Sequence, residues 1–342
     1  MLVLSKIVSL ADPSELVNIS LCSKNANIAI KSVGRFKNWQ LRIENVQNPR
    51  TIITYRTGMV QWHLNALGAR SASELLSNQH SESVTIGNSK VPVVLNTCGN
   101  GTLDCEANIL NPMKGYCLDT YWEDRIEGFK QVIEYVSDLF QLSVRDVCIH
   151  RGDEWVLEWI KTRQNEKLKD VSIFGSECYQ SEELELVLRS STPTKTLHIG
   201  ALAPENFRFT GNFPIVNEIT IENGKWITVG DLMKIDSLEC VLYDTTLSGT
   251  DINQFLHFWM DGGSPRLQYL RVETEKHLDS IFGNDRNELR WETTHEVRWY
   301  NRRPFGTKHL IEGGYTIQQK NGLKATIQYN PNNFLMVIWP QD

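Results

Sequence analysis

The sequence has 342 residues, of which 41% are hydrophobic and 22% are charged, and its formal net charge is −6. This length and composition predict about two globular domains, and the negative charge argues against a nucleic-acid-binding protein. The densest basic group is Arg298 with Arg302 and Arg303, beside Trp299 and Tyr300. We interpret it as a solvated strand edge, with a phosphate-binding patch as the alternative.

The seven cysteines are odd in number, and no pair has the C-x-x-C spacing of zinc ligands. We therefore expect reduced thiols, a cytoplasmic or nuclear location, no metal and no cofactor. A zinc site at Cys98 and Cys105, which flank a Gly-rich turn, is the alternative. Lys6 interrupts the apolar run from Leu2 to Ala11, and no apolar run reaches about 18 residues, so we expect no signal peptide and no membrane span.

The first 35 residues predict three short helices. Asp12, Pro13 and Glu15 have the spacing of a capping box, with proline at the first helical position. Apolar residues at helical spacing lie before and after this cap. They are Leu4, Ile7, Val8, Leu16, Ile19, Leu21, Ile28 and Val33. Helices this few cannot bury a core by themselves, so the segment needs a partner, either the rest of the chain or another protein.

The stretch VLSKIVSLADPSELVNISLCSKNANIAIKS resembles an F-box. The resemblance implies docking on the Skp adaptor of a cullin ubiquitin ligase. The residues it assigns to adaptor binding are Leu4, Ile7, Val8, Pro13, Leu16, Leu21 and Lys24. An F-box usually opens with a Leu-Pro pair, which is missing before Leu2, so we expect a domain of residues 1–35 that is shortened at its start and binds the adaptor more weakly. The alternative is a helix pair that only packs on the following domain.

Residues 36–123 predict a strand-rich connecting region, because their apolar residues recur with a period of two. We expect antiparallel strands here, a helical turn at 72–76 and a polar, Gly-rich loop at 98–108. A clear amphipathic helix follows at 124–142, with its apolar face at Ile126, Phe129, Ile133 and neighbours at helical spacing. We expect this helix to begin the third region, residues 124–342.

Six similar strand phrases dominate the third region. They start at residues 144, 168, 195, 216, 238 and 267, and their central apolar residues are 24, 26, 22, 22 and 29 residues apart. This spacing is close to the 20–29 residues of leucine-rich repeats, in which a strand and a return segment form each unit. The sequence therefore predicts a leucine-rich-repeat-like α/β solenoid, with return helices near 155–161, 181–188, 228–235 and 251–260. An ordinary α/β domain with evenly spaced strands is the alternative.

The C-terminal segment predicts closing strands. Gly313-Gly314 opens one strand, Asn321-Gly322 has the composition of a hairpin turn, and FLMVIW ends the chain's last strand. Together with the spacing of the phrases from about residue 140 to 340, this ending resembles the nematode-expanded F-box-associated domain of the second type.

No catalytic motif is evident. The sequence lacks a G-x-G-x-x-G turn after a strand, a P-loop, an H-E-x-x-H helix and a G-x-S-x-G elbow. Cys148 and His150 have the residue types of a nucleophile and base, but no orienting acid is specified, and a buried cysteine beside a half-buried histidine is the favoured interpretation. We therefore predict a binding protein that is not an enzyme.

The predicted target-binding surface consists of the polar positions of the strand phrases. They are Asp146, His150, Asp170, Ser172, Thr196, His198, Glu218 and Thr220. The hypothesis is a substrate-recognition subunit of a Skp–cullin–F-box ubiquitin ligase, in which the F-box binds the adaptor and the repeat-like domain binds a target protein. The alternative is a scaffold or antagonist whose F-box has degenerated and which binds targets without a ligase.

Overall fold

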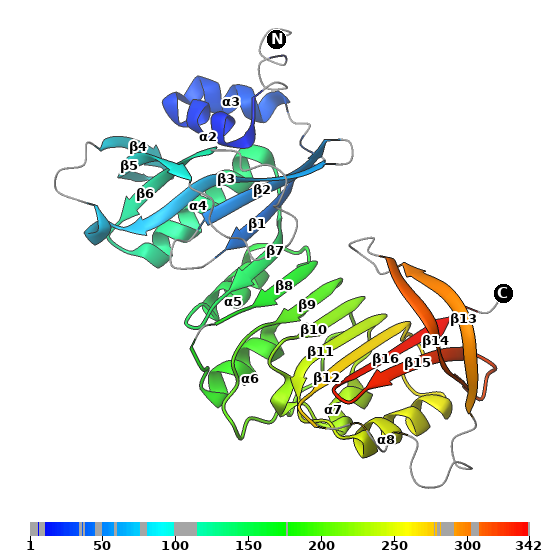
Figure 1. The fold of residues 1–342 in the computed structure, drawn as a ribbon. Coiled ribbons are helices and arrows are strands. Elements are labelled where there is room, and N and C mark those ends of the chain that lie inside the picture. Colours follow the sequence, from blue (N-terminus) through cyan, green and yellow to red (C-terminus); the bar gives the residue numbers. More distant parts are fainter. Residues whose placement is uncertain are drawn as a thin grey trace. The chain divides into compact units, whose positions relative to one another are not determined.

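A computed structural model of the chain (Figure 1) divides into two compact units. The first comprises Met1–Ile149 with Ile160–Leu168, and the second comprises His150–Trp159 with Lys169–Asp342. The structure describes residues 6, 11–33, 36, 38–44, 50–57, 60–75, 81–98, 115–175, 177–276, 278, 281, 291–301 and 308–340. The Gly-rich segment predicted at 98–108 lies outside them, apart from Cys98.

The first unit contains a mixed sheet with the strand order β7-β1-β2-β3-β6-β5-β4. Its strands are β1 (Gln40–Glu44), β2 (Arg50–Thr57), β3 (Val60–Ser71), β4 (Glu82–Ile86), β5 (Ser89–Cys98), β6 (Gly115–Trp122) and β7 (Val144–Ile149). A single turn of 3₁₀ helix, η1 (Ala72–Glu74), confirms the helical turn predicted there. The prediction of antiparallel strands is correct for β1–β2, β2–β3, β4–β5 and β5–β6, but β3 pairs with β6 in parallel, as does β1 with β7.

Helix α4 (Arg125–Phe140) packs on this sheet, against β3 and β6. Asp124 caps it by accepting hydrogen bonds from the backbone N–H groups of Ile126 and Glu127. The helix buries most of the apolar face predicted from the sequence, including Phe129 and Ile133, whereas Ile126 of that face is exposed. The division into units differs here from the boundary predicted at residue 124, because the apolar face of α4 is covered by strands of the first unit.

The second unit has the strand order β8-β9-β10-β11-β12-β16-β15-β14-β13. Its strands are β8 (Asp170–Ile173), β9 (Thr196–Ile199), β10 (Glu218–Ile221), β11 (Glu239–Thr245), β12 (Tyr269–Thr274), β13 (Trp291–Asn301), β14 (Lys308–Gln318), β15 (Lys324–Asn330) and β16 (Asn333–Trp339). Strands β8 to β12 are parallel and follow one another in sequence order, whereas β16, β15, β14 and β13 continue the sheet in antiparallel fashion. All six strand phrases are therefore strands, five of them in this parallel array.

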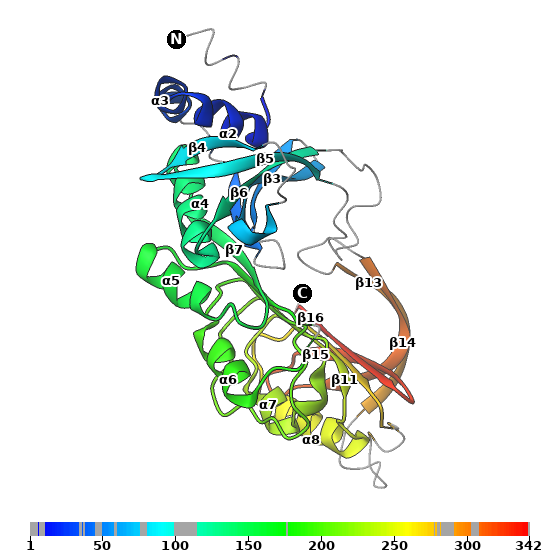
Figure 2. The same cartoon turned by 90° about the vertical axis from the view of Figure 1, so that its left-hand side faces the viewer.

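The return segments of the parallel array cover one face of the sheet (Figure 2). They include α6 (Ser181–Ser190), α7 (Val229–Lys234) and α8 (Gly249–Met260), as the sequence predicts, and also η3 (Gly224–Trp226), which it did not predict. Helix α5 (Trp155–Arg163), another predicted return helix, contributes to both units. The β9–β10 connection has no helix, and it buries Phe207 and Phe213 against Trp226. Beneath these segments lie the apolar strand residues, such as Val171, Leu197 and Ile219, all fully buried.

The β13–β14 hairpin bends so that it packs on the face opposite the helices. Its residue Ile311 joins Val241, Tyr269 and Val337 in a small buried cluster. The bend falls at Gly313 and Gly314, whose φ angles are +65° and +128°. A Cβ atom on residue 314 would lie 2.3 Å from the carbonyl oxygen of Ile327, so only glycine fits at this point of the strand.

We expect Gly314→Ala to lower the free energy of unfolding by about 1 to 3 kcal/mol, because it adds both backbone strain and a steric clash. The measurement is the midpoint of urea denaturation. Gly230→Ala is the control, since its Cβ would come no closer than 3.6 Å to Thr228 and no left-handed φ is required. Equal midpoints for the two variants would contradict the account of the bend.

Candidate functional site

The parallel register brings six of the predicted target-binding residues together on the face opposite the helices, which we call the polar face. Asp170, Thr196 and Glu218 are direct neighbours on β8, β9 and β10. Two residues further along each strand, Ser172, His198 and Thr220 form a second row. Residues two apart on a strand point to the same side, so the two rows share one surface.

The other two predicted residues lie outside these rows. Asp146 is a half-buried residue of β7 in the first unit. His150 follows β7 and belongs to the second unit, where its ring centroid is 6.2 Å from that of Phe174. Burial lowers the pKa of His150 below its usual value, because the charged imidazolium loses hydration.

Two residues that the sequence analysis did not select extend the polar face. Phe174 packs edge-on against His198, with ring centroids 4.8 Å apart, and Glu222 lies 2.8 Å from Nε2 of His198. Gly200 makes room for both, because a Cβ there would lie 2.6 Å from the Phe174 ring and 2.8 Å from the Glu222 carboxylate. The sequence signal that could have identified Phe174 and Glu222 is their position in the chain, two residues after Ser172 and Thr220 respectively.

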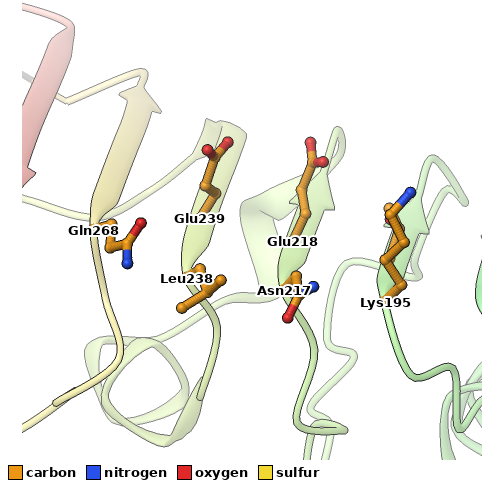
Figure 3. A pocket seen from close by; sticks show the side chains of 7 residues that line it. Lys195, Asn217, Glu218, Leu238, Glu239 and Gln268 are labelled. Atoms are coloured by element: carbon orange, nitrogen blue, oxygen red, sulfur yellow. The ribbon is translucent and has the colours of Figure 1, made fainter. Parts of the chain in front are cut away.

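A pocket of about 310 Å³ opens where β9 to β12 begin (Figure 3). The residues that line it are Lys195, Thr196, Asn217, Glu218, Leu238, Glu239 and Gln268. Glu218 and Glu239 are register partners on β10 and β11, both side chains are buried, and Figure 3 shows them pointing to the same side. The hydroxyl of Tyr300 donates a hydrogen bond of 3.2 Å to Oε1 of Glu239.

The sequence analysis selected Glu218 but missed Glu239. In the phrase alignment Val241 corresponds to Ile219, which places Glu239 one position away from Glu218, whereas the strand register pairs the two glutamates directly. Glu239 is embedded in the apolar run ECVLY, and without the register nothing indicated that its side chain shares a pocket with Glu218.

A second surface is formed by α2 (Pro13–Cys22) and α3 (Lys24–Val33), which confirm the last two predicted helices. The predicted capping box is present, since Asp12 accepts from the Glu15 backbone N–H at 2.8 Å and its own N–H donates to the Glu15 side chain at 2.9 Å. Helix α2 packs against β3 and α3 against α4.

Polar contacts reinforce this packing. The hydroxyl groups of Tyr135 and Ser20 are 2.7 Å apart, and Asn27 donates to Tyr135 at 3.2 Å. Lys31 forms an ion pair with Asp138. Burial raises the pKa of Tyr135, so its phenol stays protonated and able to donate. The helix pair is thus attached to α4 by a part-buried hydrogen-bond network and an ion pair at the surface.

The residues that the F-box resemblance assigns to adaptor binding differ in their exposure to solvent. Leu4, Ile7 and Val8 lie outside the described residues. Pro13 and Leu16 are buried within the first unit, Leu21 is half-buried and Lys24 is exposed. Pro13 and Leu16 therefore contribute to the packing of α2 within the first unit. The large apolar side chains on the outer surface are Ile19 and Ile28, which the resemblance did not assign.

Among the described residues no group of three or more histidine, cysteine or acidic side chains could hold a metal ion. Cys148 is buried, as is Cys240, where loss of hydration raises the thiol pKa. Cys105 of the alternative zinc site lies outside the described ranges. No helix in the part of the chain that the structure covers is long and apolar enough to cross a membrane.

The second unit thus combines a sheet that is covered by helices on one face with rows of polar side chains and a pocket on the other. Comparison with protein families supports an F-box-associated domain in this chain, because residues 208–272 match the family model described as F-box associated. The matched segment runs through β10, β11 and β12 and includes Glu218, Glu239 and Gln268 of the pocket. No curated protein and no solved structure matches the chain.

We expect Tyr135→Phe to loosen the helix pair, because the variant loses two hydrogen bonds worth about 1 kcal/mol each. The measurement is hydrogen exchange in peptides that cover 13–33, where protection should fall. Ser32→Ala is the control, since that exposed hydroxyl bonds only to its own helix at Ala29. Unchanged protection in Tyr135→Phe would rule out this network as an anchor.

Proposed function

We propose that the protein is the substrate-recognition subunit of a Skp–cullin–F-box ubiquitin ligase, acting in the cytoplasm or nucleus. The observation that supports this most directly is the F-box-associated match at 208–272, which covers Glu218 and Thr220 of the polar face and five of the seven residues that line the pocket. In this proposal residues 1–35 act as the F-box, 124–342 hold the target through a short leucine-rich-repeat-like array, and ubiquitin transfer is performed by the partner ligase.

The adaptor-binding surface that we propose is the outer side of α2 and α3. Its exposed members among the described residues are Ile19, Lys24 and Ile28, and the resemblance adds the half-buried Leu21 and Leu4, Ile7 and Val8, which lie outside the described residues. Ile28 is 64% exposed, and an apolar side chain in this position is typical of a residue that anchors an interface. The contacts of Tyr135 with Ser20 and of Lys31 with Asp138 attach the helix pair to α4 and so fix this surface.

Ile28→Asp should weaken binding to purified Skp adaptor by about tenfold or more, since it places a charge in an apolar contact. Co-elution and titration calorimetry measure this. Ile215→Asp is the matched control, because Ile215 is equally exposed, at 66%, but lies outside the helix pair.

Deleting residues 1–33 is a poor substitute for this test, because it removes the buried Leu16 and Val17 from the core of the first unit. An Ile28→Asp chain that binds as well as the unmodified protein would remove α3 from the interface. Absence of binding by the unmodified protein itself would favour the alternative function, a scaffold or antagonist with a degenerate F-box.

The target-binding surface that we propose is the polar face, with the pocket at one end. Charged, hydroxyl and aromatic groups alternate there, which suits a polar protein surface. The pocket volume lies at the lower limit for small-molecule sites, so it suits a single protruding side chain of a target.

The Ser172→Arg, Thr220→Arg double variant should reduce capture of target proteins about tenfold, because bulky like charges then occupy the middle of the polar face. Proximity labelling with the unmodified chain first identifies the targets, and pull-down then compares the variants. The control is Gln254→Arg on the exposed side of α8. If the double variant and the control capture the same proteins equally, the polar face is not the target-binding surface.

A further inference from the structure

The outer face of the β13–β14 hairpin forms a hydrophobic patch that the proposed function does not use. Tyr300 and Ile311 point inward, where Tyr300 stacks on Tyr269 at 5.3 Å between ring centroids. Residues between them in the strands therefore point outward. In the ladder Val297 faces Glu312, Trp299 faces Leu310 and Asn301 faces Lys308. We call these six residues the hairpin patch.

The centre of the hairpin patch is apolar and accessible. Trp299 is 59% exposed, Val297 is 61% exposed and Leu310 is 38% exposed. Tryptophan buries a large area when it is covered and is among the residues most enriched at the energetic centres of interfaces. Three large apolar side chains side by side on one hairpin thus mark a surface that gains free energy when a partner covers it.

The charges around this centre are arranged with twofold symmetry. Lys308, Leu310 and Glu312 are two residues apart on β14, so their side chains share the outer face with the leucine in the middle. A twofold axis that lies between two facing copies, parallel to the patch and perpendicular to β14 at Leu310, places Lys308 opposite Glu312 of the second copy, and Glu312 opposite its Lys308. The same axis stacks the apolar residues of the two copies.

We propose that the hairpin patch is a self-association surface, on which two copies of the chain pack face to face around this axis. Twofold contacts require a surface complementary to itself, and opposite charges at equal distances on either side of an apolar residue meet that requirement. Sheet faces pack about 10 Å apart, a distance that lysine and glutamate side chains can span together. The inner-face charges Glu296 and Arg298 pair with each other at 2.7 Å and take no part.

The size of the patch sets the strength of the association. Its six side chains are fewer than the roughly 20 to 30 residues that each partner contributes to a stable interface of standard size. The dimer is therefore weak and forms only at high protein concentration. It is independent of the ligase function proposed above, since it involves neither the helix pair nor the polar face.

Charge reversal tests the geometry directly. Lys308→Glu and Glu312→Lys should each weaken self-association about tenfold or more, because either variant sets two pairs of like charges against each other. The double variant K308E/E312K restores opposite charges across the axis and should associate within about threefold of the unmodified chain. Sedimentation equilibrium over a wide range of concentrations measures the shift from a monomer of 39.2 kDa to a dimer.

Two further variants complete the experiment. Trp299→Ala should weaken association by about thirtyfold, the loss typical of an interface anchor. Lys90→Glu, an equal charge change at an exposed residue of β5, should have no effect. Circular dichroism confirms that each variant is folded. A chain that stays monomeric at every concentration overturns the proposal, as does a dimer that the hairpin variants leave intact or that the double swap fails to restore. If the unmodified chain is monomeric and Trp299→Ala captures fewer target proteins than it does, the hairpin patch contacts targets and not a second copy.

Discussion

The structure of the second unit depends on the unbroken register of its parallel strands. From β8 to β11 each residue pairs with its counterpart on the next strand without a shift, and β12 continues the same alignment over its first four residues. Because strand side chains alternate, a slip of one residue would turn Val171, Leu197 and Ile219 outward and bury the polar rows. Because the helices pack on the apolar side of the sheet, the polar residues must face the opposite side.

The bend at Gly313 and Gly314 gives the β13–β14 hairpin two different faces. Packing of the inner face on Tyr269 and Val337 extends the core and brings the Tyr300 hydroxyl to Glu239 in the pocket. The outer face is left with Trp299 and its neighbours in solvent. A single local feature of the backbone therefore shapes both the end of the polar face and the hairpin patch.

The helix pair at the start of the chain is stabilised by the body of the first unit. Buried Leu16 and Val17 supply apolar contact, and Tyr135 supplies hydrogen bonds to both helices. As a result, a residue such as Leu16, which the F-box resemblance assigns to adaptor binding, is buried in the core of the first unit. The apolar side chains that remain exposed on the helix pair are Ile19 and Ile28. An adaptor would then meet a preorganised surface, which lowers the entropic cost of binding.

The sequence by itself determined the local structure of this protein. Alternation of apolar and polar residues located all six strand phrases, helical spacing located α4 and the return helices, and the pattern at Asp12 and Glu15 located a capping box. It also selected the six residues that the register places in two rows of the polar face, because the phrases repeat. These features depend on neighbours within a few residues, which is the range over which sequence patterns specify conformation.

Only the tertiary structure decided which residues meet and which sides remain exposed. It joined Glu239 to Glu218, added Phe174 and Glu222 to the polar face, made β3 and β6 parallel, and assigned α4 to the first unit. It also buried Leu16 and left Ile28 in solvent, although both are apolar residues at helical spacing. Register, strand order and the choice of a helix's buried side arise from contacts between residues far apart in the chain, and no local pattern encodes them.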